Sequence, residues 1–188
     1  MERLLSNVIG FDDAPFAPNF RGNIKVVGAV YAGSRFDGVI LGHIRRDGAN
    51  AAANLARLVS DSKFAAHAQL LMLQGIALGG FNVVDIFALN QYLGLPILVV
   101  ARRAPDLAAI KKALLQHVPG GKRKWALIES LGPMEPTGPV FVQRVGLSQA
   151  QARSTIDRFA LYSHIPEPLR TAHLIAGALM HGQSHGRP

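Results

Sequence analysis

The chain has 188 residues, of which 49% are hydrophobic, so it suits one domain with one core and is neither disordered nor fibrous. It contains no cysteine, which excludes disulfide bonds and thiolate metal sites. Its 20 Lys and Arg against 12 Asp and Glu give a formal charge of +8, which favours polyanionic partners, although a basic surface can also simply keep a protein soluble.

Predicted strands dominate the first half of the chain. Two β-branched runs joined by a short Gly-Ser turn predict a hairpin, and an Ala- and Leu-rich run predicts a helix. A continuous apolar run after that helix is typical of a strand buried on both faces. The predicted segments are a strand at Leu4–Phe11 that is ended by Asp12-Asp13-Ala14-Pro15, the hairpin Ile24–Ala32 and Phe36–Arg45, a helix at Asn50–Val59, a short helical piece at Ala65–Gln69 and a strand at Leu70–Leu73.

Helices and buried strands alternate in the second half. Gly94 stands where a C′ glycine commonly ends a helix, and Ser148 with Gln151 forms a capping box that opens another. A hairpin followed by βαβ units predicts a mixed sheet with helices on both faces. The predicted helices are Phe81–Tyr92, Asp106–His117, a helical turn at Lys124–Leu131, one from Ser148 to about Tyr162, and Pro166–Met180, and the strands are Pro96–Val100 and Pro139–Val145.

The chain is predicted to be a single domain without targeting segments. Its first residues carry an acid and no long apolar core, so a signal peptide is not expected. No uninterrupted apolar run approaches the ~18 residues needed to span a bilayer. We therefore expect one cytoplasmic domain over residues 1–188, with a mobile tail from about residue 181.

Carboxylates follow the ends of several predicted strands. Asp12 and Asp13 follow the first strand, and Asp85 stands beyond the central strand, which ends near Gln74. Ligands of such sheets bind at the carboxyl ends of the strands. Carboxylates from separate elements can hold Mg²⁺, which orients a water in phosphodiester displacement. Asp47 follows the hairpin, but an antiparallel strand ends at the opposite edge of a sheet.

Each of these acids also has a local explanation. The pattern D-D-x-P is a turn signal, and Asp85, inside its predicted helix, complements the helix dipole. Asn82 can be an ordinary first-turn residue. Because adjacent residues of a strand point to opposite faces, only one of Asp12 and Asp13 would normally face a given site. These local patterns leave both a metal site and a set of caps and turns open.

Glycines and cations supply candidate contacts to nucleic acid. The glycine-rich loop at residues 75–80 can cradle a phosphate, although it lacks the Walker and dinucleotide spacings. No H-E-x-x-H motif or G-x-S-x-G elbow is present, which disfavours a zinc site and a hydrolase of that type. The nucleic-acid-binding candidates are Gly75, Gly79, Gly80, Asn82, Arg102, Arg103, Lys122, Arg123, Lys124 and Arg170.

Seven blocks of the sequence follow one another in the order of a known family. They are GFDDAPF, HIRRDGANAAANL, LMLQGIALGGFNVVDI, LPILVVARRAPDLAAIKKAL, WALIESLGP, FVQRVGLSQAQA and IPEPLRTAHLIAGALMHGQSHGR. On these blocks the chain resembles the endonuclease dU family over essentially its whole length, Asn7 to Arg187. The resemblance implies an RNase H-like fold related to endonuclease V. It also implies cleavage of DNA that carries deaminated bases, deoxyuridine in particular, with Mg²⁺ (or Mn²⁺), so the implied partner is damaged or single-stranded DNA.

The resemblance also implies roles for particular residues. By analogy with endonuclease V, Asp12 is a metal ligand, and Gln74 stands where the related nuclease carries an acid. An amide supplies no charge, so Asp85 is the acid that can replace it, with its carboxylate about 4–6 Å from that of Asp12. Glu167 is the acid that a late helix adds in such folds. The expected catalytic residues are Asp12, Asp85 and Asp13, and the expected metal ligands are Asp12, Asp85, Asp47 and Glu167.

Two other functions are compatible with the sequence. A non-catalytic nucleic-acid-binding protein that keeps the nuclease fold would explain Gln74 and the basic excess. An enzyme of nucleotide metabolism would use the same pocket at the strand ends. Metal titration separates the nuclease from the binder, and the salt dependence of DNA binding separates both from the third.

Overall fold

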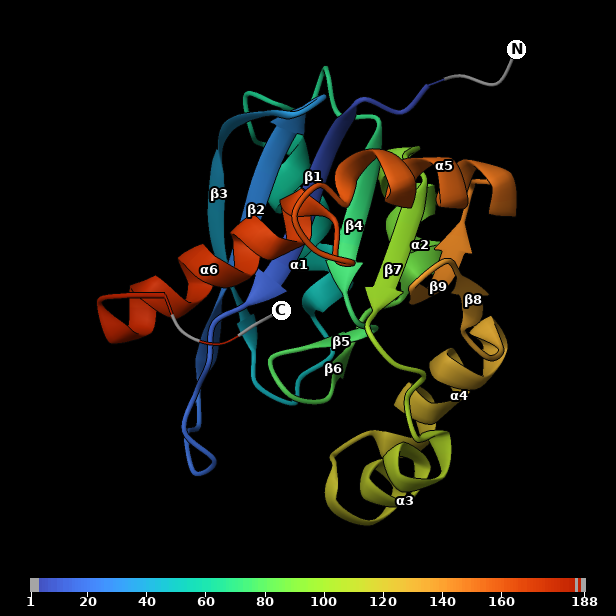
Figure 1. Ribbon diagram of the computed structural model, residues 1–188. Coiled ribbons are helices and arrows are strands. Elements are labelled where there is room, and N and C mark those ends of the chain that lie inside the picture. The colour runs from blue at the N-terminus through green and yellow to red at the C-terminus, as the bar shows by residue number, and fades with distance from the viewer. Residues whose placement is uncertain (1–3, 185, 187–188) are drawn as a thin grey trace.

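The computed structural model describes residues 4–184 and 186, in which seven strands form one sheet and two more form a separate pair. The seven are β1 (Asn7–Asp13), β2 (Asn23–Ala32), β3 (Arg35–Arg45), β4 (Leu70–Gln74), β7 (Ile97–Ala101), β8 (Glu135–Thr137) and β9 (Val140–Val145), and the pair is β5 (Ala77–Leu78) with β6 (Asn82–Val83). The sheet order is β3-β2-β1-β4-β7-β9-β8 (Figure 1). Only β1–β4 and β4–β7 are parallel, so the predicted mixed sheet is confirmed.

Helices cover both faces of this sheet, as predicted (Figure 1). They are α1 (Ala51–Ser60), α2 (Ile86–Leu93), α3 (Leu107–His117), α4 (Gly121–Leu131), α5 (Gln149–Phe159) and α6 (Glu167–His181). α5 and α6 pack on one face, and α1 and α2 pack on the other. α3 and α4 contact each other and form a lobe beyond the carboxyl end of β7.

The central strands divide their side chains between two cores. Val8 and Met72 lie in the core under α5 and α6, and Ile9 and Leu73 lie in the core under α1 and α2. A strand that is buried on both faces needs apolar residues at every position rather than at alternate ones. This is why the β4 segment is a continuous apolar run in the sequence.

α6 begins in direct contact with the middle of β1. A Cβ atom added to Gly10 would lie 2.5 Å from the carbonyl carbon of Pro168, so only glycine permits this approach. β1 also pairs in parallel with β4, with Phe11 opposite Leu73. Asp12 thus stands near the end of β1 and beside the end of β4, as the alternation of hairpin and βαβ segments predicts.

The first strand and the segment before β4 differ from their predictions. β1 continues through Asp12 and Asp13 because Asp13 pairs with Val26 of β2, so strand pairing overrides the local turn signal. The predicted helical piece at Ala65–Gln69 consists of turns, in which the His67 N–H donates to the carbonyl of Phe64.

The glycine-rich region and the lobe also differ from their predictions. The helix predicted from Phe81 begins only at Ile86, because β6 pairs with β5 and occupies the residues before it. α4 begins at Gly121 and is longer than the predicted helical turn. β8 has no counterpart among the predicted elements.

No helix in the described part of the chain is long and apolar enough to cross a membrane. α6 continues to His181, and the predicted mobile tail from about residue 181 lies partly outside the described residues.

Candidate active site

Three polar side chains, those of Asp12, Gln74 and Arg102, follow the ends of β1, β4 and β7. The parallel registers place Asp12 next to Gln74, and Gln74 opposite Val100, two residues before Arg102. Strand alternation turns Asp12 and Gln74 to the face that carries α6, because Val8 and Met72, at even spacings before them, lie in the core under that helix. This edge is where open α/β sheets bind their ligands.

The central contact of this site joins the first strand to the last helix. His173 of α6 donates from Nδ1 to Asp12 Oδ2 over 2.8 Å, and Asp12 Oδ1 accepts from the Asp13 N–H at 2.9 Å. Asp12 is only 5% exposed. The hydrogen bond to Asp12 raises the pKa of His173, and the negative charges of Asp12 and Asp13 raise it further. Burial of the ring and the positive charge of Arg102 lower the pKa in part, but the net shift is upward. The Asp12–His173 pair is therefore a charge-assisted contact in a largely buried setting.

Sequence reasoning missed His173. Its partner is 161 positions away, so no local motif pairs the two. The available signal was its place in the apolar stripe of the last helix, close to Leu169, Ala172 and Ala176, which are all buried. A histidine on the buried side of a helix needs a polar partner, and the sheet beneath the helix supplies one.

Gln74 contributes an oxygen without a partner. Its Oε1 atom is buried and makes no hydrogen bond with any described residue. A buried polar atom without a partner is uncommon and calls for an explanation, such as an ion or water that completes it. Beside the Asp12 carboxylate, this amide oxygen is an additional neutral ligand for a cation.

Asp13 points to the opposite face, as strand alternation predicts. Its Oδ2 accepts from the Gly79 N–H at 2.9 Å. Burial, and then the neighbouring charge of Asp12, raise the pKa of Asp13 to about 7, although the hydrogen bonds from the Gly79 N–H and from its own N–H act in the other direction. Asp13 therefore holds the glycine-rich loop, and it is ionised in the folded protein only near and above neutral pH.

Asp13→Asn is expected to stabilise the metal-free protein at pH 8. The pKa of about 7 in the folded protein exceeds the ordinary aspartate pKa of 3.8, so ionised Asp13 destabilises the fold progressively as pH rises from about 4 to 7. The variant should gain about 2–4 kcal/mol in free energy of unfolding at pH 8, and the gain should vanish near pH 4. Urea denaturation in EDTA measures this, with exposed Asp61→Asn as the control. A gain that does not change with pH would contradict the assignment.

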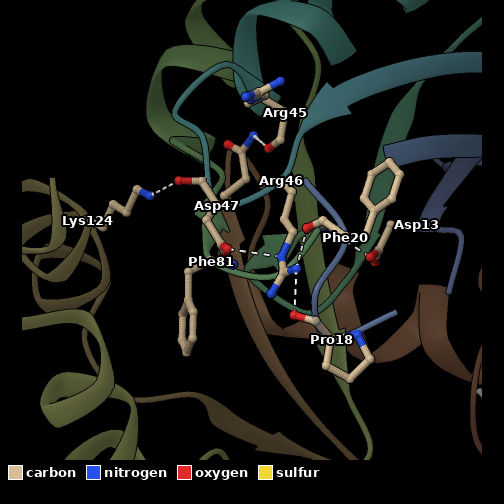
Figure 2. Close-up of polar contacts among 10 residues, drawn as sticks. Asp13, Pro18, Phe20, Arg45, Arg46, Asp47, Phe81 and Lys124 are labelled. Carbon is tan, nitrogen blue, oxygen red and sulfur yellow. Dashed lines mark hydrogen bonds and ion pairs between the residues drawn. The ribbon is translucent and has the colours of Figure 1, made fainter. Parts of the chain in front are cut away.

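The glycine-rich segment is held by a network around Asp47 (Figure 2). Asp47 Oδ1 accepts from the Phe81 N–H at 2.8 Å, and Oδ2 lies 3.1 Å from Arg46 Nε. The Asp47 N–H donates to the Gly79 carbonyl, and Lys124 Nζ donates to the Asp47 carbonyl. Asp47 adopts a φ of 50°, the only positive value among described non-glycine residues. The Arg46 guanidinium already neutralises this carboxylate within the network that holds the loops, which disfavours its predicted role as a metal ligand.

Asn82 and Lys124 are structural residues as well. Asn82 is fully buried: its Oδ1 accepts from the Ala51 N–H at 3.1 Å, and its Nδ2 donates to the Arg45 carbonyl and to Asn50 Oδ1, both at 2.8 Å. Lys124 is 4% exposed, and burial lowers its pKa, against the opposing charge of Asp47. Their prediction as nucleic-acid contacts is wrong, since neither side chain is accessible.

The other predicted acids do not join Asp12. Asp85 is the N-cap of α2, where its Oδ1 accepts from the Ala88 N–H at 3.0 Å, and α2 packs on the face opposite α6. Glu167 is buried, and both of its oxygens accept from Arg170 Nε. Among the described residues, no group of three or more His, Cys, Asp or Glu side chains can hold a metal ion. Asp85 is a cap rather than a neighbour of Asp12 because α2 starts later than expected.

The predicted cations do not converge on one face either. Arg102 and Arg170 line one cavity near the Asp12–His173 pair. Arg123 lines a different cavity, between α1 and α2, which it shares with Asp85. Lys122 and Arg103 are exposed, and Gly80 approaches Asp47 so closely that a Cβ would lie only 2.4 Å from its Oδ1. All three predicted loop glycines also adopt positive φ values, so their backbone conformation accounts for them without a phosphate.

The sheet order and the site at the ends of β1 and β4 define an RNase H-like fold of the endonuclease V type. Ciona intestinalis endonuclease V, in complex with a 24mer DNA containing an inosine followed by a ribo-adenosine, superposes with a TM-score of 0.55 at 14% identity, over 89% of this chain and 82% of that one. At this identity the similarity shows the fold, and it confirms the predicted fold class.

The chain belongs to the Endonuclease dU family, whose profile matches residues 5–180. It is 56% identical over 183 residues to a UPF0215 protein of Deinococcus radiodurans, and the alignment covers 97% of this chain and 93% of the relative. The crystal structure of a protein of unknown function from Archaeoglobus fulgidus superposes with a TM-score of 0.87 at 31% identity, over 94% of this chain and 99% of that one. The predicted family membership is confirmed.

Proposed function

We propose that this protein is a Mg²⁺- or Mn²⁺-dependent endonuclease that cleaves DNA carrying deaminated bases, deoxyuridine in particular, as a step in DNA repair. The observation that carries the proposal is the Asp12–His173 pair beside the unpartnered Gln74 Oε1, at the carboxyl ends of the strands. The name of the family and the fold it shares with endonuclease V support the same reading.

The residues fit a cation whose coordination is completed by oxygens of the substrate. Mg²⁺ is usually bound by one or two carboxylates, several waters and phosphate oxygens rather than by an all-protein cage. Asp12 supplies one carboxylate and Gln74 one neutral oxygen. When bound, the metal supplies charge stabilisation and an activated water for phosphodiester hydrolysis.

The protein side chains have separate tasks in this scheme. His173 uses Nδ1 to orient the Asp12 carboxylate. Its Nε2 is then the ring nitrogen that can exchange a proton with water or with a substrate oxygen. Arg102 and Arg170 offer charged donors to the DNA phosphates near this pair.

A panel of labelled oligonucleotides tests the proposal. Strands containing uracil, hypoxanthine or only normal bases are incubated with Mg²⁺, Mn²⁺ or EDTA. We expect cleavage of the uracil strand with either metal, little cleavage of the normal strand, and none in EDTA. Equal cleavage of all strands would contradict the substrate, and cleavage in EDTA would contradict the role of the metal.

A non-catalytic DNA-binding protein is the second candidate. It is favoured by the neutral amide at Gln74 and by the lack of a three-acid group in the described residues. Such a protein would bind DNA in EDTA with an affinity that falls steeply with salt, and it would leave every strand of the panel intact.

A further inference from the structure

A cavity of about 520 Å³ adjoins the Asp12–His173 pair. Arg170 and Leu174 line it from α6, on either side of His173, and Arg102 enters from the end of β7. The connection between α5 and α6 lines another side, and Gly186, beyond the end of α6, lines the cavity near His173 Nε2. The residues that line it include Arg102, Tyr162, Ser163, His164, Arg170 and Leu174.

The cavity presents fixed positive charge. Arg170 Nε donates to Glu167 Oε1 at 2.9 Å and to Oε2 at 3.0 Å, and Glu167 is itself buried. This anchoring orients the guanidinium and leaves its two terminal nitrogens without a partner among the described residues. Arg102 is exposed and likewise makes no ion pair within the described chain. Two arginine side chains therefore offer several donors with the geometry that phosphate accepts.

The aromatic ring of Tyr162 lies beside the charged guanidinium of Arg170. Tyr162 is 81% exposed, and the Arg170 guanidinium lies 5.9 Å from the centre of its ring. An exposed aromatic ring beside a cationic groove is the arrangement on which single-stranded nucleic acids stack their bases. Packing within the chain does not account for Tyr162, because most of its surface faces solvent.

We propose that this cavity binds one nucleotide of an unpaired DNA strand, with its base stacked on Tyr162 and its phosphate held by Arg102 and Arg170. The strand must be unpaired because the bases of a duplex already stack on their neighbours. The cavity thus positions the strand beside the Asp12–His173 pair. The proposal rests on the proposed function in one respect, namely that DNA is the substrate.

Binding of a short, fluorescein-labelled single strand in EDTA tests this cavity without cleavage. Tyr162→Ala is expected to weaken binding by about 5- to 100-fold, as the loss of one stacked base predicts. Tyr162→Phe should bind like the unchanged protein, because it keeps the ring. Arg102→Gln should reduce the slope of log K against log salt by about 0.7, the value for one phosphate contact of a single strand.

Tyr92→Ala is the matched control. Tyr92 is also an exposed tyrosine, at 70%, but it lies on α2 on the other face of the sheet, so its loss should leave binding unchanged. Thermal unfolding of each variant shows that the fold is kept. Equal affinity of Tyr162→Ala and the unchanged protein would overturn the proposal, as would an equal loss with Tyr92→Ala.

The outcomes separate this cavity from the proposed nuclease activity. Binding that depends on Tyr162, without cleavage of any strand by the metal-loaded protein, supports the cavity and contradicts the nuclease. Cleavage of uracil-containing DNA with an unchanged affinity and KM in Tyr162→Ala overturns the cavity and leaves the nuclease standing. A protein that binds no single strand overturns the cavity directly.

Discussion

Asp12→Asn is expected to reduce metal-dependent cleavage of uracil-containing DNA by about two to four orders of magnitude. The substitution keeps the shape of the side chain but removes the carboxylate that lies next to Gln74 at the ends of the strands. Without that charge, the cation loses its anionic ligand and His173 loses the partner that raises its pKa. Single-turnover rates with excess enzyme measure the effect, and binding in EDTA shows whether DNA is still held.

Asp85→Asn is the sharpest comparison for this experiment. Asparagine caps helices about as well as aspartate, so a residue that only caps α2 should tolerate the change with nearly full activity. A loss as large as that of Asp12→Asn would mean that the site extends to the α2 face. If Asp12→Asn itself kept full activity, the catalytic centre would lie elsewhere in the fold.

Gly10→Ala is expected to destabilise the protein by about 2–3 kcal/mol and to lower its activity as well. The added Cβ would lie 2.5 Å from the carbonyl carbon and 2.7 Å from the carbonyl oxygen of Pro168, which are backbone atoms that no rotamer change can move. α6 must then shift away from β1, at the cost of an overpacked core. Because α6 carries His173, the same shift separates that side chain from Asp12.

Gly42→Ala provides the matched control. Its added Cβ would lie 2.3 Å from Leu58 Cδ1, at the end of a flexible side chain, which can turn away. Its loss of stability should therefore be smaller, and its cleavage rate should stay unchanged. Thermal unfolding and the cleavage rate are measured for both variants. Equal melting temperatures for Gly10→Ala and the unchanged protein would show that α6 accommodates the methyl group.

Features that depend on local patterns could be predicted from the sequence. The continuous apolar run of β4, the hairpin of β2 and β3, the Ser148 capping box and the αL conformation of Gly94 are all observed. The position of Asp12 beside β4 also followed from the alternation of elements. Each of these features is decided by residues within a few positions of one another, or by simple rules of sheet topology.

The rest depends on contacts between distant segments. β5 and β6 have two residues each, too short for any periodic signal. Asn82 is buried by bonds to the Arg45 carbonyl, 37 positions away, which the sequence around it does not show. The same is true of His173 and Asp12. The predicted topology indicated the carboxyl ends of the strands, but the contacts of Asp85 and Asp47 depend on where a helix starts and on how a loop is held, which the sequence does not show.

The buried amine of Lys124 has a consequence for how the molecule opens. Lys124 Nζ donates to the Asp47 carbonyl, and the Asp47 N–H donates to the Gly79 carbonyl, so two successive hydrogen bonds connect α4 to the glycine-rich turn. Breaking the bond from Lys124 leaves a carbonyl without its donor and a buried ammonium group without its acceptor. Separate opening of the lobe or of the glycine-rich turn is therefore unfavourable. The lobe and the turn thus belong to one cooperative unit. Because the Gly79 N–H also donates to Asp13, loosening of α4 is expected to be felt at Asp13, the last residue of β1.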